Sequence, residues 1–152
     1  MTKPIALCAA AVMLAALGVA RADSPSGASG IDPIAVRQAG YALQGGDFAY
    51  IRSVVEAKGD VKPLEVPAKA ISKWGRVIPT LFPKGSETGE NTKALPKIWS
   101  DPDGFQKIAV ALVQASDKLA TDAKAGATDL VAADTKELGK QCGACHKAYR
   151  AK

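Results

Sequence analysis

Near the end of the chain, residues 142–146 read Cys-Gly-Ala-Cys-His and are followed by Lys-Ala-Tyr-Arg. The two cysteines and the histidine are spaced i, i+3 and i+4, which places all three on one face of a helix. Two thiols at this spacing can add to the two vinyl groups of one porphyrin, and the imidazole then reaches the iron from the same side. The pattern predicts one covalent haem c per chain, joined to Cys142 and Cys145, with His146 as an axial iron ligand.

Two other kinds of site share the Cys-x-x-Cys spacing. A thioredoxin-type redox pair normally opens a helix that follows a strand, and no strand pattern precedes Cys142. A zinc site needs two further ligands. Outside the first 22 residues, however, the sequence has no third cysteine and no second histidine. Haem attachment is therefore the favoured interpretation.

The first 22 residues have the features of a cleaved secretion signal. Lys3 supplies a short positive region, Ile5–Val19 is apolar, and Ala20-Arg21-Ala22 fits a small-x-small cleavage site. The apolar run is shorter than the ~20 residues that span a membrane, so we expect cleavage after Ala22 and no membrane anchor. Because the remaining cysteines both lie in the haem motif, the expected location is the bacterial periplasm.

Cleavage would change the charge balance of the chain. It removes two of the 20 basic residues and none of the 15 acidic ones, so the net charge falls from +5 to +3. Two haem propionates would lower it further. Since no aromatic residues are interleaved with the basic ones, we expect no nucleic-acid binding.

The mature chain begins with a flexible leader and a long helix. Residues 23–31 are rich in serine, glycine and proline, as is typical of a loose segment. Asp32 and Pro33 then form an N-cap and a first helical position, and apolar residues at helical spacing continue to about Lys58. Gly45-Gly46 is a weak point at which a bend is expected.

Apolar spacing predicts three more helices after Gly59, in one domain over residues 32–152. They cover about 63–81, 100–126 and 128–149, and a long loop over 82–99 separates the first two of these. Val77 and Leu130 are assigned to the apolar faces of these helices. No alternation typical of strands is present. The expected fold is an all-α, antiparallel four-helix bundle with its cofactor between helices, near the end of the last one.

The sequence offers no strong second ligand for a haem iron. Electron carriers usually place methionine or histidine there, but Met1 and Met13 lie in the signal segment and His146 is the only histidine. Lysine and tyrosine remain as weaker candidates, and a lysine ligand would have to lose a proton with a pKa of ~10.4. Another molecule could also supply the ligand. We expect a five-coordinate, high-spin iron whose open distal face binds NO or CO.

Side chains on the first and last helices are candidates for the haem pocket. Tyr41 is the distal candidate, and Arg37, one turn earlier, would bind a propionate, since a guanidinium can hold a carboxylate in bidentate fashion. Arg150 lies one turn beyond His146 on the proximal side. The alternatives are that Tyr41 packs in the core, that Arg37 forms a surface ion pair and that Arg150 is a free charge at a helix end.

Three segments resemble the class II cytochromes c, specifically cytochrome c′. They are residues 36–43 (VRQAGYAL), 96–101 (PKIWSD) and 142–150 (CGACHKAYR). The resemblance runs from about Asp32 to the end, and the C-terminal position of the haem motif is its most specific feature. It implies a left-handed four-helix bundle in the periplasm, often a homodimer, with haem c on the two cysteines and His146 as proximal ligand.

The same resemblance assigns further pocket residues and shows two departures. Low-spin relatives of the c-556 type carry a methionine ligand on the first helix, where this chain reads Leu43-Gln44-Gly45. The first departure is Gly45-Gly46, which is unusual inside the first helix. The second is the loop over 87–95, which is longer than in close relatives. The residues that the resemblance places around the haem are Arg37 for a propionate, followed by Gln38 as in the family, Tyr41 as the distal cap, Phe82 at the haem edge and Arg150 at the proximal pocket. Within the departing loop we assign Thr92 and Lys93 to positions near the propionates.

Two functions fit these observations. The first is a gas-binding haem protein that buffers or scavenges NO, suggested by the missing sixth ligand. The second is an electron carrier between periplasmic redox partners, suggested by the covalent haem. A high-spin iron that gains a ligand on reduction reorganises more than a six-coordinate one, which favours gas binding. Peroxidase chemistry would need a distal histidine or arginine as acid and base, so we do not expect an enzyme.

Overall fold

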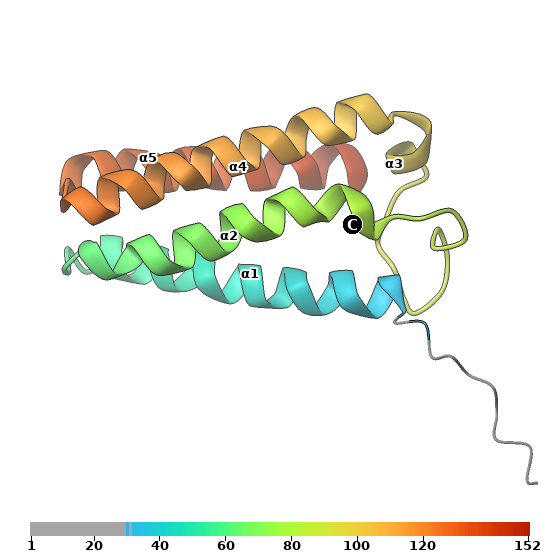
Figure 1. The fold of residues 1–152 in the computed structure, drawn as a ribbon, viewed down its shortest axis with the longest axis horizontal. Coiled ribbons are helices and arrows are strands. Elements are labelled where there is room, and N and C mark those ends of the chain that lie inside the picture. The colour runs from blue at the N-terminus through green and yellow to red at the C-terminus, as the bar shows by residue number, and fades with distance from the viewer. Residues whose placement is uncertain (1–29, 31) are drawn as a thin grey trace, which may run out of the picture. The chain divides into compact units, whose positions relative to one another are not determined.

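The computed structural model describes residue 30 and residues 32–152. The predicted signal peptide (1–22) and nearly all of the predicted leader (23–31) lie outside the described residues. Within 32–152, four long helices lie lengthwise against one another in an antiparallel bundle (Figure 1). They are α1 (Pro33–Glu56), α2 (Glu65–Val77), α4 (Pro102–Ala125) and α5 (Thr128–Tyr149). The predicted all-α four-helix bundle is confirmed.

Three short elements lie beside α2 and before α4. The 3₁₀ helices η1 (Lys62–Leu64) and η2 (Ile78–Leu81) flank α2, so the single helix predicted over 63–81 is divided. Proline lacks the N–H that an α-helical interior needs, and Pro63 and Pro79 lie in these two tighter turns. The short α3 (Lys97–Ser100) lies in what was predicted as loop. None of the described helices is long and apolar enough to span a bilayer.

The long helices begin and end at the expected signals. The Asp32 carboxylate accepts hydrogen bonds from the backbone N–H of Ile34 at 2.9 Å and of Ala35 at 3.2 Å, which caps α1. Gly126 ends α4 in the left-handed region with φ of +73°, a conformation that favours glycine. Residues 45–46 stay within α1, which continues as a helix to Glu56.

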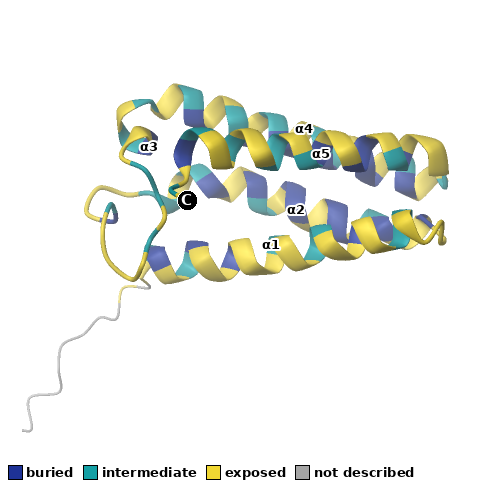
Figure 2. Ribbon diagram, turned by 180° about the vertical axis from the view of Figure 1, so that it is seen from behind, coloured by how far each residue is buried: buried dark blue, intermediate teal, exposed yellow. Residues whose placement is uncertain are grey.

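The bundle has a densely packed end, which we call the closed end. It is the end at which α1 and α4 finish and α2 and α5 begin, and Figure 2 shows buried residues along the inward faces of the helices. Its fully buried side chains include Ile51, Leu64, Leu119 and Val131. Burial of such side chains in contact with one another is the main favourable term in folding.

Two residues assigned to apolar faces are exposed in the structure. Val77 is 42% exposed and Leu130 is 51% exposed, so their predicted placement was wrong. Val77 occupies the last turn of α2. Leu130 precedes the fully buried Val131, and neighbouring positions on a helix point about 100° apart, so only one of the two faces the core.

The opposite end of the bundle, which we call the loop end, is less densely packed. Here α1 begins, α5 ends, and residues 82–96 connect η2 to α3. The backbone of α1 comes close to α2 at Gly40, where an added Cβ would lie 1.9 Å from Cζ2 of Trp74. Glycine at this position therefore allows the indole ring to lie directly against α1.

Candidate haem site

A cavity of about 470 Å³ lies at the loop end, between the first half of α1 and the last turns of α5. Its volume is within the range of small-molecule and cofactor pockets. Apolar side chains from α2 and α4, such as Ile71, Phe105 and Leu112, form much of its lining. The cavity brings together all ten predicted site residues: Arg37, Gln38, Tyr41, Phe82, Thr92, Lys93, Cys142, Cys145, His146 and Arg150.

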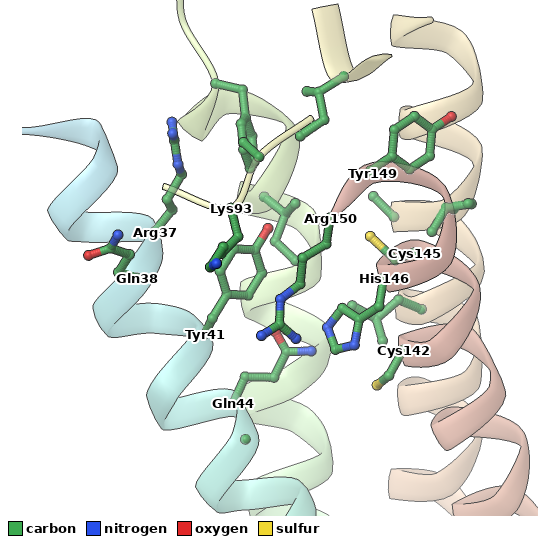
Figure 3. Close-up of a pocket in the computed structure, with 18 of the residues that line it drawn as sticks. Arg37, Gln38, Tyr41, Gln44, Lys93, Cys142, Cys145, His146, Tyr149 and Arg150 are labelled. Carbon is green, nitrogen blue, oxygen red and sulfur yellow. The ribbon is translucent and has the colours of Figure 1, made fainter. Parts of the chain in front are cut away.

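One wall of the cavity is formed by the Cys-x-x-Cys-His segment of α5 (Figure 3). Cys142 and Cys145 lie well inside this helix, which begins at Thr128, and not at its N-terminus. Burial raises the pKa of both thiols, that of Cys145 to about 11. In redox cysteine pairs the pKa of the reactive thiol is lowered and the pair opens a helix. Neither the raised pKa values nor the position of the pair inside α5 supports the thioredoxin-type alternative.

The third residue of this wall, His146, is suited to metal binding. Burial, and then the charge of Arg150, lower the pKa of the imidazole, which favours the neutral form that binds metals. Within residues 32–152 no group of three or more His, Cys, Asp or Glu side chains could hold a metal ion, so zinc is not supported. Two thiols and a neutral imidazole on one wall of an apolar cavity fit a haem held by thioether bonds.

The facing wall comes from α1 and carries Tyr41. The ring of Tyr41 meets that of Trp74 edge to face, with centroids 6.2 Å apart. Burial raises the pKa of the Tyr41 phenol, so its hydroxyl stays protonated at neutral pH. Tyr41 is 36% exposed and lines the cavity, which means that it packs on the bundle on one side and faces the cavity on the other.

Arg37 is buried and bound to the loop that covers the cavity. It is only 2% exposed, so the alternative of a surface ion pair was wrong. One terminal nitrogen, Nη1, donates to Leu81 O at 3.2 Å and Ser86 Oγ at 2.9 Å, and Nη2 donates to Ser86 O at 2.7 Å and Thr92 Oγ1 at 2.9 Å. A guanidinium has five N–H donors, so Nε is the nitrogen left for a propionate.

Phe82 lies beneath the guanidinium and joins an aromatic cluster. The Arg37 Cζ atom is 4.5 Å from the centre of the Phe82 ring, a cation–π contact. The same ring meets Trp99 and Phe105 edge to face, at centroid distances of 5.8 and 5.1 Å. This cluster joins the start of the loop to α3 and α4 at the cavity edge.

The remaining predicted residues connect the loop to α1 and to the end of α5. Gln38 donates through Nε2 to Glu90 O at 2.8 Å. Lys93 O accepts a hydrogen bond from Ala151 N at 2.8 Å, and Lys93 Nζ donates to Lys152 O at 3.2 Å. Ala94 and Arg150 form an isolated antiparallel bridge. The loop therefore lies between the two walls and is hydrogen-bonded to residues of both.

Three further residues of the site were not predicted. Ser86 accepts two of the Arg37 hydrogen bonds, and Tyr149 donates its hydroxyl to Asp101 Oδ2 at 2.9 Å, which joins the last turn of α5 to the start of α4. Gln44 lines the cavity from α1. Gln44 has a sequence signal, because it follows Arg37 by seven residues and Tyr41 by three and so shares their helix face. Tyr149 has the same signal, because it follows Cys142 by seven residues and Cys145 by four.

Comparison with known proteins identifies the family. The family described as Cytochrome C′ matches residues 32–150. The chain belongs to the cytochrome c′ family. Haem c, bound covalently through cysteines, is the cofactor of cytochromes c′, and Cys142 and Cys145 stand in the motif that this attachment requires.

Relatives of the cytochrome c′ family match the chain over different lengths. Cytochrome c-554 from Cereibacter sphaeroides is 41% identical over 96 residues, which cover 58% of this chain and 61% of that protein. Cytochrome c′ from Allochromatium vinosum is 29% identical over 150 residues, covering 96% and 97%. The solved nitric oxide complex of a mutant cytochrome c prime from Alcaligenes xylosoxidans has a TM-score of 0.72 and 29% identity, covering 80% of this chain and 94% of that one.

Proposed function

We propose that this protein is a periplasmic cytochrome c′ whose five-coordinate, high-spin haem binds NO or CO at an open distal face and can also transfer electrons. The observation that carries the proposal is the composition of the α1 wall. The side chains that it turns to the cavity include Arg37, Tyr41 and Gln44, and none of these is a methionine or histidine, the usual second ligand in an electron carrier. In this proposal residues 1–22 are removed on export and residues 32–152 form the haem domain.

Each wall of the cavity has a separate role in this proposal. The sulfur atoms of Cys142 and Cys145 hold the porphyrin covalently, and His146 supplies the proximal nitrogen. When bound, the haem supplies an iron that takes diatomic ligands and single electrons. Tyr41 restricts the distal space, while Arg150 lies beside the proximal pocket.

The loop residues hold the edge of the site in place. Arg37 fixes the loop through three hydrogen bonds and holds the end of η2 through a fourth, and its Nε remains to meet one propionate together with Gln38. Thr92 and Lys93 approach the propionates from the loop, and Phe82 packs at the haem edge. These assignments extend the family resemblance to the positions at which the cavity lining contains the same residues.

Gas binding is favoured over a dedicated electron carrier for two reasons. A related cytochrome c prime has been solved as a nitric oxide complex. In addition, a high-spin iron that gains a ligand on reduction reorganises more than a six-coordinate one, which slows electron exchange. The alternative, a carrier for periplasmic redox partners without a physiological gas role, is favoured only by the covalent haem itself.

The proposal includes a homodimer. Apolar side chains on the outer surfaces of α1 and α2 are exposed in the single chain, among them Leu43, Tyr50 and Val66. A second copy that covered such a surface would remove these side chains from water. Sedimentation of the purified holoprotein would then show a mass twice that of one chain.

The decisive test is the coordination state of the purified ferrous protein. Resonance Raman and optical spectra should show five-coordinate, high-spin iron before any gas is added and should change on titration with NO or CO. A six-coordinate, low-spin spectrum without added gas would contradict the open distal face. Electron self-exchange at the rate of six-coordinate carriers, with no binding of either gas, would favour the carrier function instead.

A further inference from the structure

Gln44 occupies the same face of α1 as two residues of the proposed site. Arg37, Tyr41 and Gln44 are spaced i, i+4 and i+7, which makes one continuous stripe on a helix. All three line the cavity. Figure 3 shows the Gln44 side chain extending from α1 toward His146 of α5 and toward Arg150, which follows the end of α5. Its carboxamide therefore points into the space opposite the proximal imidazole.

The hydrogen bonds of the cavity glutamines set Gln44 apart. Three glutamines line the cavity, and two of them have partners. Gln38 donates to Glu90 O at 2.8 Å, and Gln141 donates to Glu137 Oε1 at 2.6 Å. The Oε1 atom of Gln44 is buried and has no hydrogen-bond partner among the described residues. An unpaired carboxamide is unfavourable in a buried position, whereas a leucine would line the same wall without that penalty.

Nearby protein groups do not provide the missing partner. All four terminal N–H donors of Arg37 are taken, one by Leu81 O at the end of η2 and three by Ser86 and Thr92 of the loop. Rotation about the terminal torsion of glutamine is broad and roughly two-fold, so the amide can present either its oxygen or its nitrogen to the cavity. A small molecule in the cavity is the partner that this arrangement allows.

We propose that Gln44 is a specificity-determining residue of the distal face, where its Nε2 donates a hydrogen bond to the outer atom of the bound diatomic gas. This inference rests on the proposed gas-binding function. The hydrogen bond draws electron density onto the ligand, which weakens the bond inside the ligand and slows its departure. The site then favours gases whose outer atom carries partial negative charge.

The experiment compares carbon monoxide complexes of the full-length holoprotein. Gln44→Leu removes the amide, and Gln44→Glu, measured at alkaline pH so that the buried carboxyl is ionised, keeps its shape but replaces the N–H donor with a carboxylate. Both variants should raise the C–O stretching frequency and release carbon monoxide about 3- to 10-fold faster, the effect of losing one ordinary hydrogen bond. Gln114→Leu makes the same change at an exposed position of α4 that does not line the cavity, and this matched control should leave both quantities unchanged.

The outcomes separate this inference from the proposed function. If the unchanged protein binds carbon monoxide and both Gln44 variants keep its frequency and release rate, the hydrogen bond does not exist and the gas-binding function stands. If the frequency and the release rate changed in Gln44→Leu alone, the change would come from the altered shape of the cavity, and the proposed hydrogen bond would also be contradicted. If the unchanged protein binds no carbon monoxide, both proposals are wrong. Identical unliganded ferrous spectra would show that the variants keep the haem site intact.

Discussion

The closed end and the loop end of the bundle use the same four helices for different purposes. At the closed end, Leu64, Leu119 and Val131 are fully buried, and helix meets helix through apolar side chains. At the loop end, α1 and α5 are separated by a cavity, and a buried arginine and a loop fill part of the space. The closed end supplies the packing that stabilises the bundle, which allows the loop end to keep a cavity for the haem.

The largest expected effect comes from damaging the closed end. Leu119→Ala leaves a cavity in a fully buried position, and substitutions of this kind lower the free energy of unfolding by about 2–5 kcal/mol. Urea unfolding measures the loss. The haem spectrum and carbon monoxide binding should not change, because Leu119 does not line the cavity. Val110→Ala, on the same helix but exposed, is the control. An altered haem spectrum in Leu119→Ala would show that the two ends are not independent.

A smaller effect is expected from loosening the loop end. Arg37→Lys replaces a forked side chain by an ammonium that cannot reach all four acceptors, so buried oxygens such as Ser86 O lose their partner. Each such loss costs roughly 1–3 kcal/mol, and we expect about 2 kcal/mol together with faster hydrogen exchange in residues 82–96. Arg52→Lys, in an exposed pair with Glu56, is the matched control. Equal exchange rates in the two variants would show that Arg37 does not hold the loop.

The smallest expected effect is a pH-dependent change in stability at the hydrogen bond between Tyr149, at the end of α5, and Asp101, at the start of α4. The hydroxyl of Tyr149 and the backbone N–H of Gly104 lower the pKa of Asp101. Folding therefore favours the ionised carboxylate, which adds to the free energy of unfolding. This contribution is fully present above the ordinary aspartate pKa and is lost as the pH falls through the lowered pKa of the folded protein. Asp101→Asn should reduce stability at pH 7 and have little effect near pH 2. If the stability difference between Asp101→Asn and the unchanged protein stayed constant from pH 7 to pH 2, this role of the ionised Asp101 carboxylate would be contradicted.

The sequence predicted the two walls of the site better than the loop between them. Cys142, Cys145 and His146 follow a local spacing rule, and so do Arg37 and Tyr41, because helical periodicity fixes which residues share a face. The partners of Arg37 could not be predicted, since Ser86 and Thr92 are 49 and 55 residues away in the chain. Such contacts depend on how the loop returns to α1, which no local pattern specifies.

The errors in the helix assignments have the same origin. Leu130 and Val77 are apolar and lie at plausible helical spacing, yet each is exposed because the rotation of a helix depends on its packing partners. The short α3 interrupts a segment without apolar periodicity. Its backbone hydrogen bonds, such as Trp99 N to Pro96 O at 3.1 Å, need no such pattern. Local rules therefore identified the long elements, and tertiary contacts decided the rest.

Both tryptophans of the chain lie at the loop end. Trp74 packs against Tyr41, and Trp99 donates through Nε1 to Phe82 O at 2.9 Å. Their emission would be quenched by energy transfer to a nearby haem and would return as that half of the molecule opens. Intrinsic fluorescence therefore reports on one half of the bundle, while circular dichroism at 222 nm reports on all of it. Any gap between the two melting curves would measure directly how far the halves unfold separately.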